Sequence, residues 1–174
     1  KKDYGCRIGG PPGYMVNCPG PCENDPRDTS IVATYRRGQV VPMRWAKNNH
    51  DEGFIRWTMV KKEWTMDKAM HDKYAFEYSC WSTTLVPCQG AYECGSDENG
   101  KAWTGNITIP AIYPDGDYVL GWAWFGGGTY SYLGDYYSCA SIRVSGGPLE
   151  ASFQPIAAQC LSTMNALGEC PVEP

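Results

Sequence analysis

The chain has 174 residues, enough for one domain with a core of its own and too few to require a second domain. Its formal net charge of -4 and pI near 5.1, with basic residues scattered singly or in pairs, argue against nucleic acid as a partner. No apolar run approaches the roughly 20 residues that cross a bilayer, and the first residues lack a signal-peptide core, so we expect a soluble, mature chain.

The first 33 residues are dense in glycine and proline, which interrupt both helices and strand ladders. The stretch GGPPG at 9–13 and the prolines around Cys18 and Cys22 are typical of an irregular loop. We therefore expect residues 1–33 to form an irregular N-terminal segment that its cysteines hold in place.

From residue 34 the pattern changes to short β-rich runs bounded by Gly, Pro, Asn or Asp. The expected strands are 39–45, 53–60, 74–81, 105–110, 117–125 and 136–144. The run 117–125 alternates, with one face carrying Tyr118, Leu120, Trp122 and Trp124. Six strands without helical periods between them favour an all-β fold, an antiparallel sandwich or barrel.

Three other segments accompany the strands. Residues 61–73 are polar and could form a short helix or a long loop, and we expect His71 within them to lie at the surface. Residues 113–118 contain Pro-Asp-Gly and are expected to form a structural turn. Residues 145–174 are expected to form a C-terminal arm, so that one domain spans 1–174 with its β-sandwich at 34–144.

Nine cysteines are more than a cytosolic chain of this length usually carries, and they predict an oxidising, extracellular compartment. Disulfides are preferred over zinc, because the C-x3-C pair Cys18 and Cys22 has no second pair with zinc-ligand spacing. The pairing stays open, and the odd count leaves one thiol unpaired or bonded to another chain. The nine are Cys6, Cys18, Cys22, Cys80, Cys88, Cys94, Cys139, Cys160 and Cys170.

Other motifs bear on modification and on hydrolytic activity. The tripeptide NIT at 106–108 is the chain's only N-x-S/T sequon, which predicts Asn106 as the glycosylation site of a secreted glycoprotein. A glycosidase needs two carboxylates at a set separation. The available pairs, at 51–52 and at 115 and 117, lie in expected turns, where acidic residues are common, so a glycosidase is not favoured.

Four fragments between 38 and 144 resemble, in this order, the lytic polysaccharide monooxygenases, the secreted copper enzymes of chitin and cellulose breakdown. They are GQVVPMRWAKNNHDEGFIRW, FEYSCW, IPAIYPDGDYVLGWAWFGG and YYSCASIRV. The resemblance implies an immunoglobulin-like antiparallel β-sandwich with long loops gathered around one flat face.

The resemblance also implies a copper site. In that family, copper is bound by the amino group and ring of an N-terminal histidine and by a second histidine, with an axial tyrosine nearby. The second histidine maps to His50 and the tyrosine to Tyr136. The chain has Lys1 in place of the terminal histidine, and Gly134 where the family usually has Gln or Glu. The expected site therefore lacks its chelating residue, and no cofactor is expected.

These observations favour a non-catalytic extracellular module that binds a polysaccharide or assembles with copies of itself as a filament or matrix subunit. Tyr130 and Tyr132, in the glycine-rich stretch FGGGTYSYLGDYY, are the candidate glycan contacts, because aromatic faces stack on sugar rings. The alternative is a copper-dependent lytic polysaccharide monooxygenase whose true N-terminal histidine precedes Lys1. Copper would then be its cofactor, with His50 and Tyr136 as ligands.

Overall fold

The computed structural model describes residues 22, 30–46, 54–80, 84–87, 101–125 and 135–156. Within these residues the elements are β1 (Ala33–Tyr35), β2 (Val40–Ala46), β3 (Phe54–Lys61), η1 (Lys62–Trp64), α1 (Lys68–Lys73), β4 (Ala75–Cys80), β5 (Thr84–Pro87), β6 (Lys101–Thr108), β7 (Gly116–Phe125) and β8 (Asp135–Val144). No described helix is long and apolar enough to cross a membrane.

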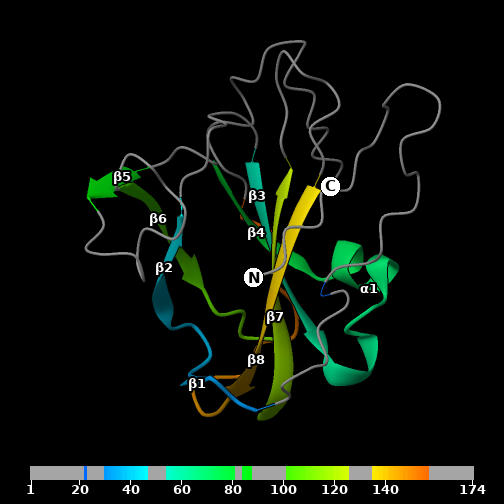
Figure 1. Ribbon diagram of the computed structural model, residues 1–174. Coiled ribbons are helices and arrows are strands. Elements are labelled where there is room, and N and C mark those ends of the chain that lie inside the picture. The colour runs from blue at the N-terminus through cyan, green and yellow to red at the C-terminus, as the bar shows by residue number, and fades with distance from the viewer. Residues whose placement is uncertain are drawn as a thin grey trace, which may run out of the picture.

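The strands form two sheets that face each other (Figure 1). The larger sheet has the order β1-β8-β7-β3-β4, and the smaller has the order β2-β6-β5. All pairs of neighbouring strands are antiparallel except β1, which runs parallel to β8. The predicted immunoglobulin-like sandwich is confirmed, with this parallel edge pair as its departure from a purely antiparallel fold.

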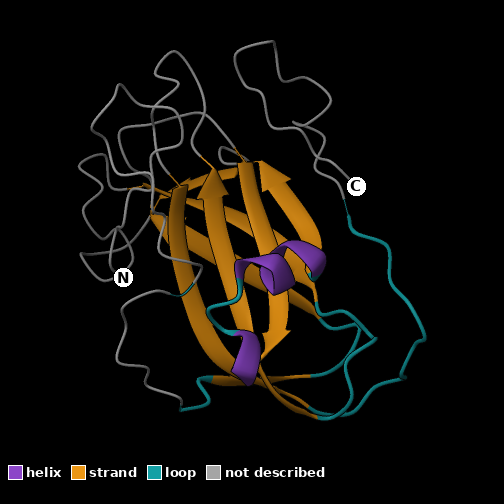
Figure 2. Cartoon of the chain, turned by 90° about the vertical axis from the view of Figure 1, so that its right-hand side faces the viewer, coloured by secondary structure: helices purple, strands orange, loops and turns teal. Residues whose placement is uncertain are grey.

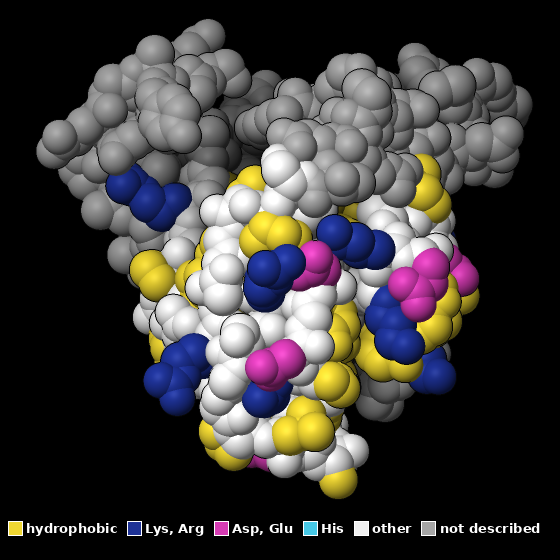
Figure 3. All heavy atoms as spheres, turned by 90° about the horizontal axis from the view of Figure 1, so that it is seen from below, with side chains coloured by type: hydrophobic (Ala, Val, Ile, Leu, Met, Phe, Trp, Pro, Cys, Tyr) yellow, Lys and Arg dark blue, Asp and Glu magenta, His cyan; other side chains and the backbone are white. Residues whose placement is uncertain are grey.

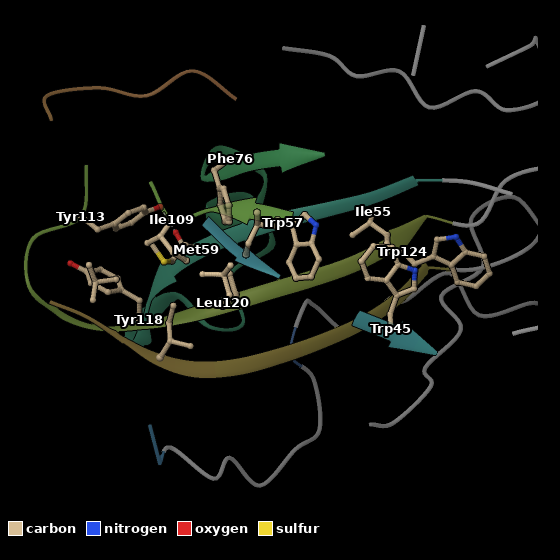
Figure 4. Close-up of a cluster of buried hydrophobic side chains, with 14 residues drawn as sticks. Trp45, Ile55, Trp57, Met59, Phe76, Ile109, Tyr113, Tyr118, Leu120 and Trp124 are labelled. Carbon is tan, nitrogen blue, oxygen red and sulfur yellow. Dashed lines mark hydrogen bonds between the residues drawn. The ribbon is translucent and has the colours of Figure 1, made fainter. Parts of the chain in front are cut away.

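The main core lies between the two sheets (Figure 4). The alternation expected in 117–125 is confirmed, since Tyr118, Leu120 and Trp124 are all buried in this core. Trp45 of β2 meets Trp57 of β3 edge-on, with 6.3 Å between ring centroids, and so joins the smaller sheet to the larger one. Burial of each large apolar side chain contributes about 1.5–3 kcal/mol, which makes this layer the main source of stability.

A second apolar cluster lies on the opposite face of the larger sheet, which η1 and α1 cover (Figure 2). Val60 of β3 and Val119 of β7 pack there against Met70 of α1. The helix begins after Asp67, whose side chain accepts a hydrogen bond from the backbone N–H of Met70 at 3.2 Å. The polar segment 61–73 therefore forms two short helical turns instead of a long loop, and their apolar side faces the sheet.

The described part of the C-terminal arm returns along the molecule to the edge of β4. The N–H of Ile156 donates to the carbonyl of Phe76 at 3.0 Å, and the N–H of Tyr78 donates to the carbonyl of Ile156 at 2.8 Å. Residues 145–156 therefore add a short parallel bridge to an edge strand.

Replacement of Tyr113 by phenylalanine tests how much a buried hydrogen bond contributes to the stability of this core. Its hydroxyl donates to the carbonyl of Met59, and its ring is buried against Tyr118 with centroids 4.9 Å apart. Tyr113→Phe should lower the free energy of unfolding by about 1–2 kcal/mol, because the Met59 carbonyl loses a partner inside the protein. Urea denaturation measures this. The control is Tyr35→Phe, whose hydroxyl bonds to no other described residue, and an equal loss in both variants would contradict the prediction.

Candidate functional site

The backbone of Tyr136, the tyrosine mapped to the copper site, lies at one end of the larger sheet. β3 begins at Phe54, β7 ends at Phe125 and β8 begins at Asp135, and the register sets these three residues side by side (Figure 1). Tyr136 follows Asp135 directly, so its backbone lies at this end. His50 stands four residues before Phe54 in the sequence and lies outside the described residues. The copper assignment of His50 and Tyr136 therefore stays a prediction.

Of the other predicted site residues apart from the cysteines, two lie outside the described residues and one lies within them. Tyr130 and Tyr132 lie outside the described residues, so their role as glycan contacts stays a prediction. Asn106 lies on β6 and is exposed, as a surface site requires.

One disulfide is described, and it joins Cys22 to Cys139 of β8 with 5.3 Å between their Cα atoms. The sequence favoured disulfides over zinc, and for this pair that prediction is confirmed. The bond closes a sequence separation of 117 residues, and Cys22 packs against the valines beneath α1. The side chains of the other seven cysteines lie outside the description, so their pairing stays open.

The expectation for His71 is wrong. This side chain is not at the surface but fully buried, with 0% of its area exposed. It lies on the side of α1 that faces the larger sheet, where it meets Thr58 of β3 and Gly121 of β7. A signal was present in the sequence, because Met70 and His71 precede Tyr74 by four and three residues, the spacings at which side chains are neighbours on a helix.

Both ring nitrogens of His71 are engaged inside the protein. Nε2 lies 3.1 Å from the carbonyl oxygen of Thr65, which can only accept, so Nε2 carries the hydrogen and donates it. Nδ1 lies 2.6 Å from Oγ1 of Thr58, so the Thr58 hydroxyl donates to its lone pair. The sulfur of Cys22 is 4.0 Å from Nε2 and closes the third side. The two hydrogen bonds therefore fix one neutral tautomer.

The surroundings keep this imidazole neutral. Burial lowers the pKa of His71 from 6.5 to about 4, because the charged ring would lose its hydration. The hydrogen bond to Thr65 raises the pKa and Arg56 lowers it, and both effects are smaller than that of burial. Arg56 itself forms an ion pair with Asp72 of α1, which holds the helix against β3.

Gly121 has no side chain, and the imidazole of His71 packs against the backbone at this position. A Cβ at this position would overlap Oγ1 of Thr58 and lie 3.0 Å from Nδ1 of His71. Gly121→Ala should therefore lower the free energy of unfolding by about 1–3 kcal/mol, the usual range for overpacking a filled interior.

Chemical denaturation measures this loss, and Gly116→Ala on the same strand is the matched control. A Cβ at Gly116 would lie 3.6 Å from the ring of Tyr118, an ordinary contact, so that change should alter stability by about 0.5 kcal/mol or less. Equal stability of the two variants would count against the close packing of Thr58 and His71 around Gly121.

The acidic pair in the 113–118 turn has a structural role. Asp115 forms an ion pair with Arg37 and accepts the N–H of Gly146 at 3.1 Å, and these contacts lower the pKa of its carboxyl group. Asp117 accepts from Nε of Arg143 at 2.7 Å, which lowers its pKa as well. Both carboxylates remain ionised and paired, which is unsuited to a general acid, so the glycosidase interpretation gains no support.

The only buried carboxylate among the described residues belongs to Glu77 of β4. It accepts the N–H of Thr108 at 2.9 Å and thereby joins β4 to the end of β6 in the other sheet. Burial raises its pKa, and the hydrogen bond from Thr108 opposes this rise. The described residues contain no group of three or more His, Cys, Asp or Glu placed to hold a metal ion.

Surface charge on the described residues is mixed. On the face seen in Figure 3, basic and acidic side chains lie beside one another among apolar ones. Ion pairs also occur among the described residues, as between Lys68 and Asp72 at 2.8 Å. This face therefore carries no broad patch of one sign.

Comparison with known proteins yields structural neighbours only, since no protein-family model and no curated protein matches the chain. The fold is similar to a lytic polysaccharide monooxygenase of the AA15 group from Thermobia domestica in the Cu(I) state, at 16% identity and a TM-score of 0.46. That alignment covers 67% of this chain and 64% of the other.

Two further solved structures are similar. The extended catalytic domain of H. jecorina LPMO9A is 19% identical, with a TM-score of 0.42 and coverage of 71% of this chain and 52% of that one. The cellulose-active enzyme CelS2 in complex with copper is 18% identical, with a TM-score of 0.43 and coverage of 66% and 53%. The chain thus spans about half to two thirds of the length of these three proteins. They belong to the family that the four sequence fragments resemble, and at this level the likeness concerns the fold alone.

Proposed function

We propose that the chain is an extracellular module that binds polysaccharide without oxidising it. The observation that carries the proposal is the engagement of His71, whose two ring nitrogens are both occupied within the protein. A metal would need a lone pair on one of them, and the lone pair on Nδ1 already accepts from Thr58. His71 is therefore unsuited to hold copper.

The sequence contains two histidines, so His50 is the one that remains as a candidate copper ligand. The family's copper site requires two imidazoles and a terminal amine. One imidazole with a tyrosine nearby lacks the chelate and would bind copper weakly. His71, with both ring nitrogens engaged, does not supply the second imidazole of that site, and this supports a role in binding over one in oxidation.

Two observations favour a carbohydrate ligand outside the cell. The stretch 125–137 holds Tyr130 and Tyr132 among glycines, and aromatic faces are the usual platform for sugar rings. The Cys22–Cys139 disulfide is typical of proteins from oxidising compartments, where extracellular polysaccharides are met.

Sedimentation with insoluble cellulose and with chitin tests binding. The wild-type chain should be depleted from the supernatant, and Tyr130→Ala with Tyr132→Ala should weaken binding roughly tenfold by removing two stacking surfaces. The control is Leu149→Ala, which changes an exposed apolar side chain in the C-terminal arm and should bind as the wild type does. A chain that binds neither polysaccharide but sediments as an oligomer would instead support the assembling subunit.

Copper titration followed by electron paramagnetic resonance tests the absence of oxidation. We expect no tight type-2 signal from the wild-type chain, and loss of no more than weak copper binding with His50→Ala. The protein from its natural source should be sequenced at its N-terminus in parallel. A tight signal that disappears with His50→Ala would overturn the proposal and support the copper enzyme, with a terminal histidine upstream of Lys1.

A further inference from the structure

Asn106 lies on the outer face of the smaller sheet. It belongs to β6, the central strand between β2 and β5 (Figure 1), and its register partner is Pro42 of β2. The next residue, Ile107, points between the sheets and is 1% exposed. Because successive side chains of a strand point to opposite faces, Asn106 points outward, and it is exposed.

The surroundings of Asn106 are open, and two exposed apolar side chains lie on the neighbouring strand β2, where the exposed Arg44 follows them. Pro42 is exposed, and Val40, two residues earlier on β2, has 59% of its area exposed. The Asn106 side chain forms no hydrogen bond with any other residue that the structure describes. Its amide is therefore available for modification without the loss of a contact in the described fold.

The strand beside Asn106, β2, is exposed to pairing with a strand of another chain. β2 is an edge strand in the order β2-β6-β5. An edge strand with exposed apolar side chains, here Val40 and Pro42, favours pairing with another chain unless something blocks it. Pro42 interrupts the row of backbone donors, and the apolar surface around it stays uncovered by the described residues.

We propose that Asn106 carries an N-linked oligosaccharide that covers Val40 and Pro42 and shields the edge strand β2. The sequon of Asn106 and Thr108 supplies the chemistry, and the outward direction of the side chain supplies the access. The Cys22–Cys139 disulfide is independent support, because disulfides form in the compartment where such sugars are added. This inference does not depend on the proposed polysaccharide binding.

Secretion from insect cells tests the modification. The wild-type protein should show the mass of an attached oligosaccharide, and peptide-N-glycosidase should remove it and convert Asn106 to aspartate in the peptide map. Thr108→Ser keeps a valid sequon and should keep the sugar, whereas Asn106→Gln and Thr108→Ala should each lose it. Secreted wild-type protein with the Cys22–Cys139 disulfide formed and Asn106 unmodified would overturn the proposal.

The test of shielding uses only the wild-type protein, so its result does not depend on whether a variant folds. Glycosylated and enzymatically deglycosylated samples are compared by analytical ultracentrifugation over a range of concentrations. The deglycosylated sample should self-associate at a concentration at least several-fold lower. Identical association of the two samples would overturn the shielding of β2.

Discussion

Replacing Cys22 and Cys139 together by alanine should lower the free energy of unfolding by about 4–5 kcal/mol. The disulfide spans 117 residues of sequence, and a cross-link over so long a loop removes much conformational freedom from the unfolded chain. A loss of this size is comparable with the whole stability of many domains. The midpoint of thermal unfolding should fall by roughly 10–20 °C for a chain of this length.

Scanning calorimetry and urea titration both measure this effect. Replacement of the same pair by serine is the matched control for side-chain character. If the cross-link dominates, the alanine and serine pairs should lose nearly the same stability, although Cys22 packs against Val60 and Val119. A loss below about 1 kcal/mol in both would show that the bond contributes little, as happens when the unfolded chain retains structure.

Acidification from pH 6.5 to pH 4 should remove about 3 kcal/mol of stability through His71 alone. The pKa of His71 is about 4 in the folded protein, below the 6.5 of the unfolded chain. The contribution is complete above pH 6.5, because both states are then neutral. Below pH 6.5 the unfolded state binds the proton first, so stability falls until the folded pKa near 4 is passed.

The other described groups with shifted pKa values affect stability differently between pH 6.5 and pH 4. Burial raises the folded pKa of Glu77, so its protonation favours the folded state as the pH falls and opposes the effect of His71. The folded pKa values of Asp72, Asp115 and Asp117 lie below 3.8, so their contributions are lost mainly below pH 4. Among the described groups whose pKa is shifted, His71 is therefore the one that lowers stability between pH 6.5 and pH 4.

Substitution of His71 tests this assignment directly. His71→Gln should flatten the dependence of unfolding free energy on pH between 6.5 and 4, whatever its stability at neutral pH, because no group titrates at that buried position. Leu149→Ala, which removes no titrating group, should retain the full dependence. Urea titrations at half-unit pH intervals separate the two, and an unchanged slope in His71→Gln would contradict the burial of a neutral imidazole.

The sequence predicted the strands that alternate strongly and missed the weakest ones. The run 117–125 was recognisable because its apolar residues repeat every second position, and β7 occupies almost the same residues. β1 and β5 have three and four residues, too few for a period to be seen. The parallel pairing of β1 with β8 joins segments more than 100 residues apart, which local pattern does not reveal.

The candidate site was predictable only in part. Charged neighbours such as Asp72 and Lys73 made His71 resemble a surface residue, and its burial depends on Gly121, 50 residues later in the chain. The partner of Cys22 was equally hidden, because nine cysteines allow many pairings and the fold alone selects among them. His50 and Tyr136 were assigned through the family resemblance, which no local pattern of this chain could replace.

The contact between α1 and β7 makes positions 71 and 121 share one volume. A methyl group at 121 would meet the side chains of Thr58 and His71, and a smaller side chain at 71 would remove the second of these contacts and leave space into which Thr58 could turn. His71→Ala combined with Gly121→Ala should therefore be destabilised by less than the sum of the two single changes. The two positions are thus energetically coupled through space. For the same reason, relatives that carry a side chain at 121 should carry something smaller than histidine at 71, and the two sites should change together during evolution.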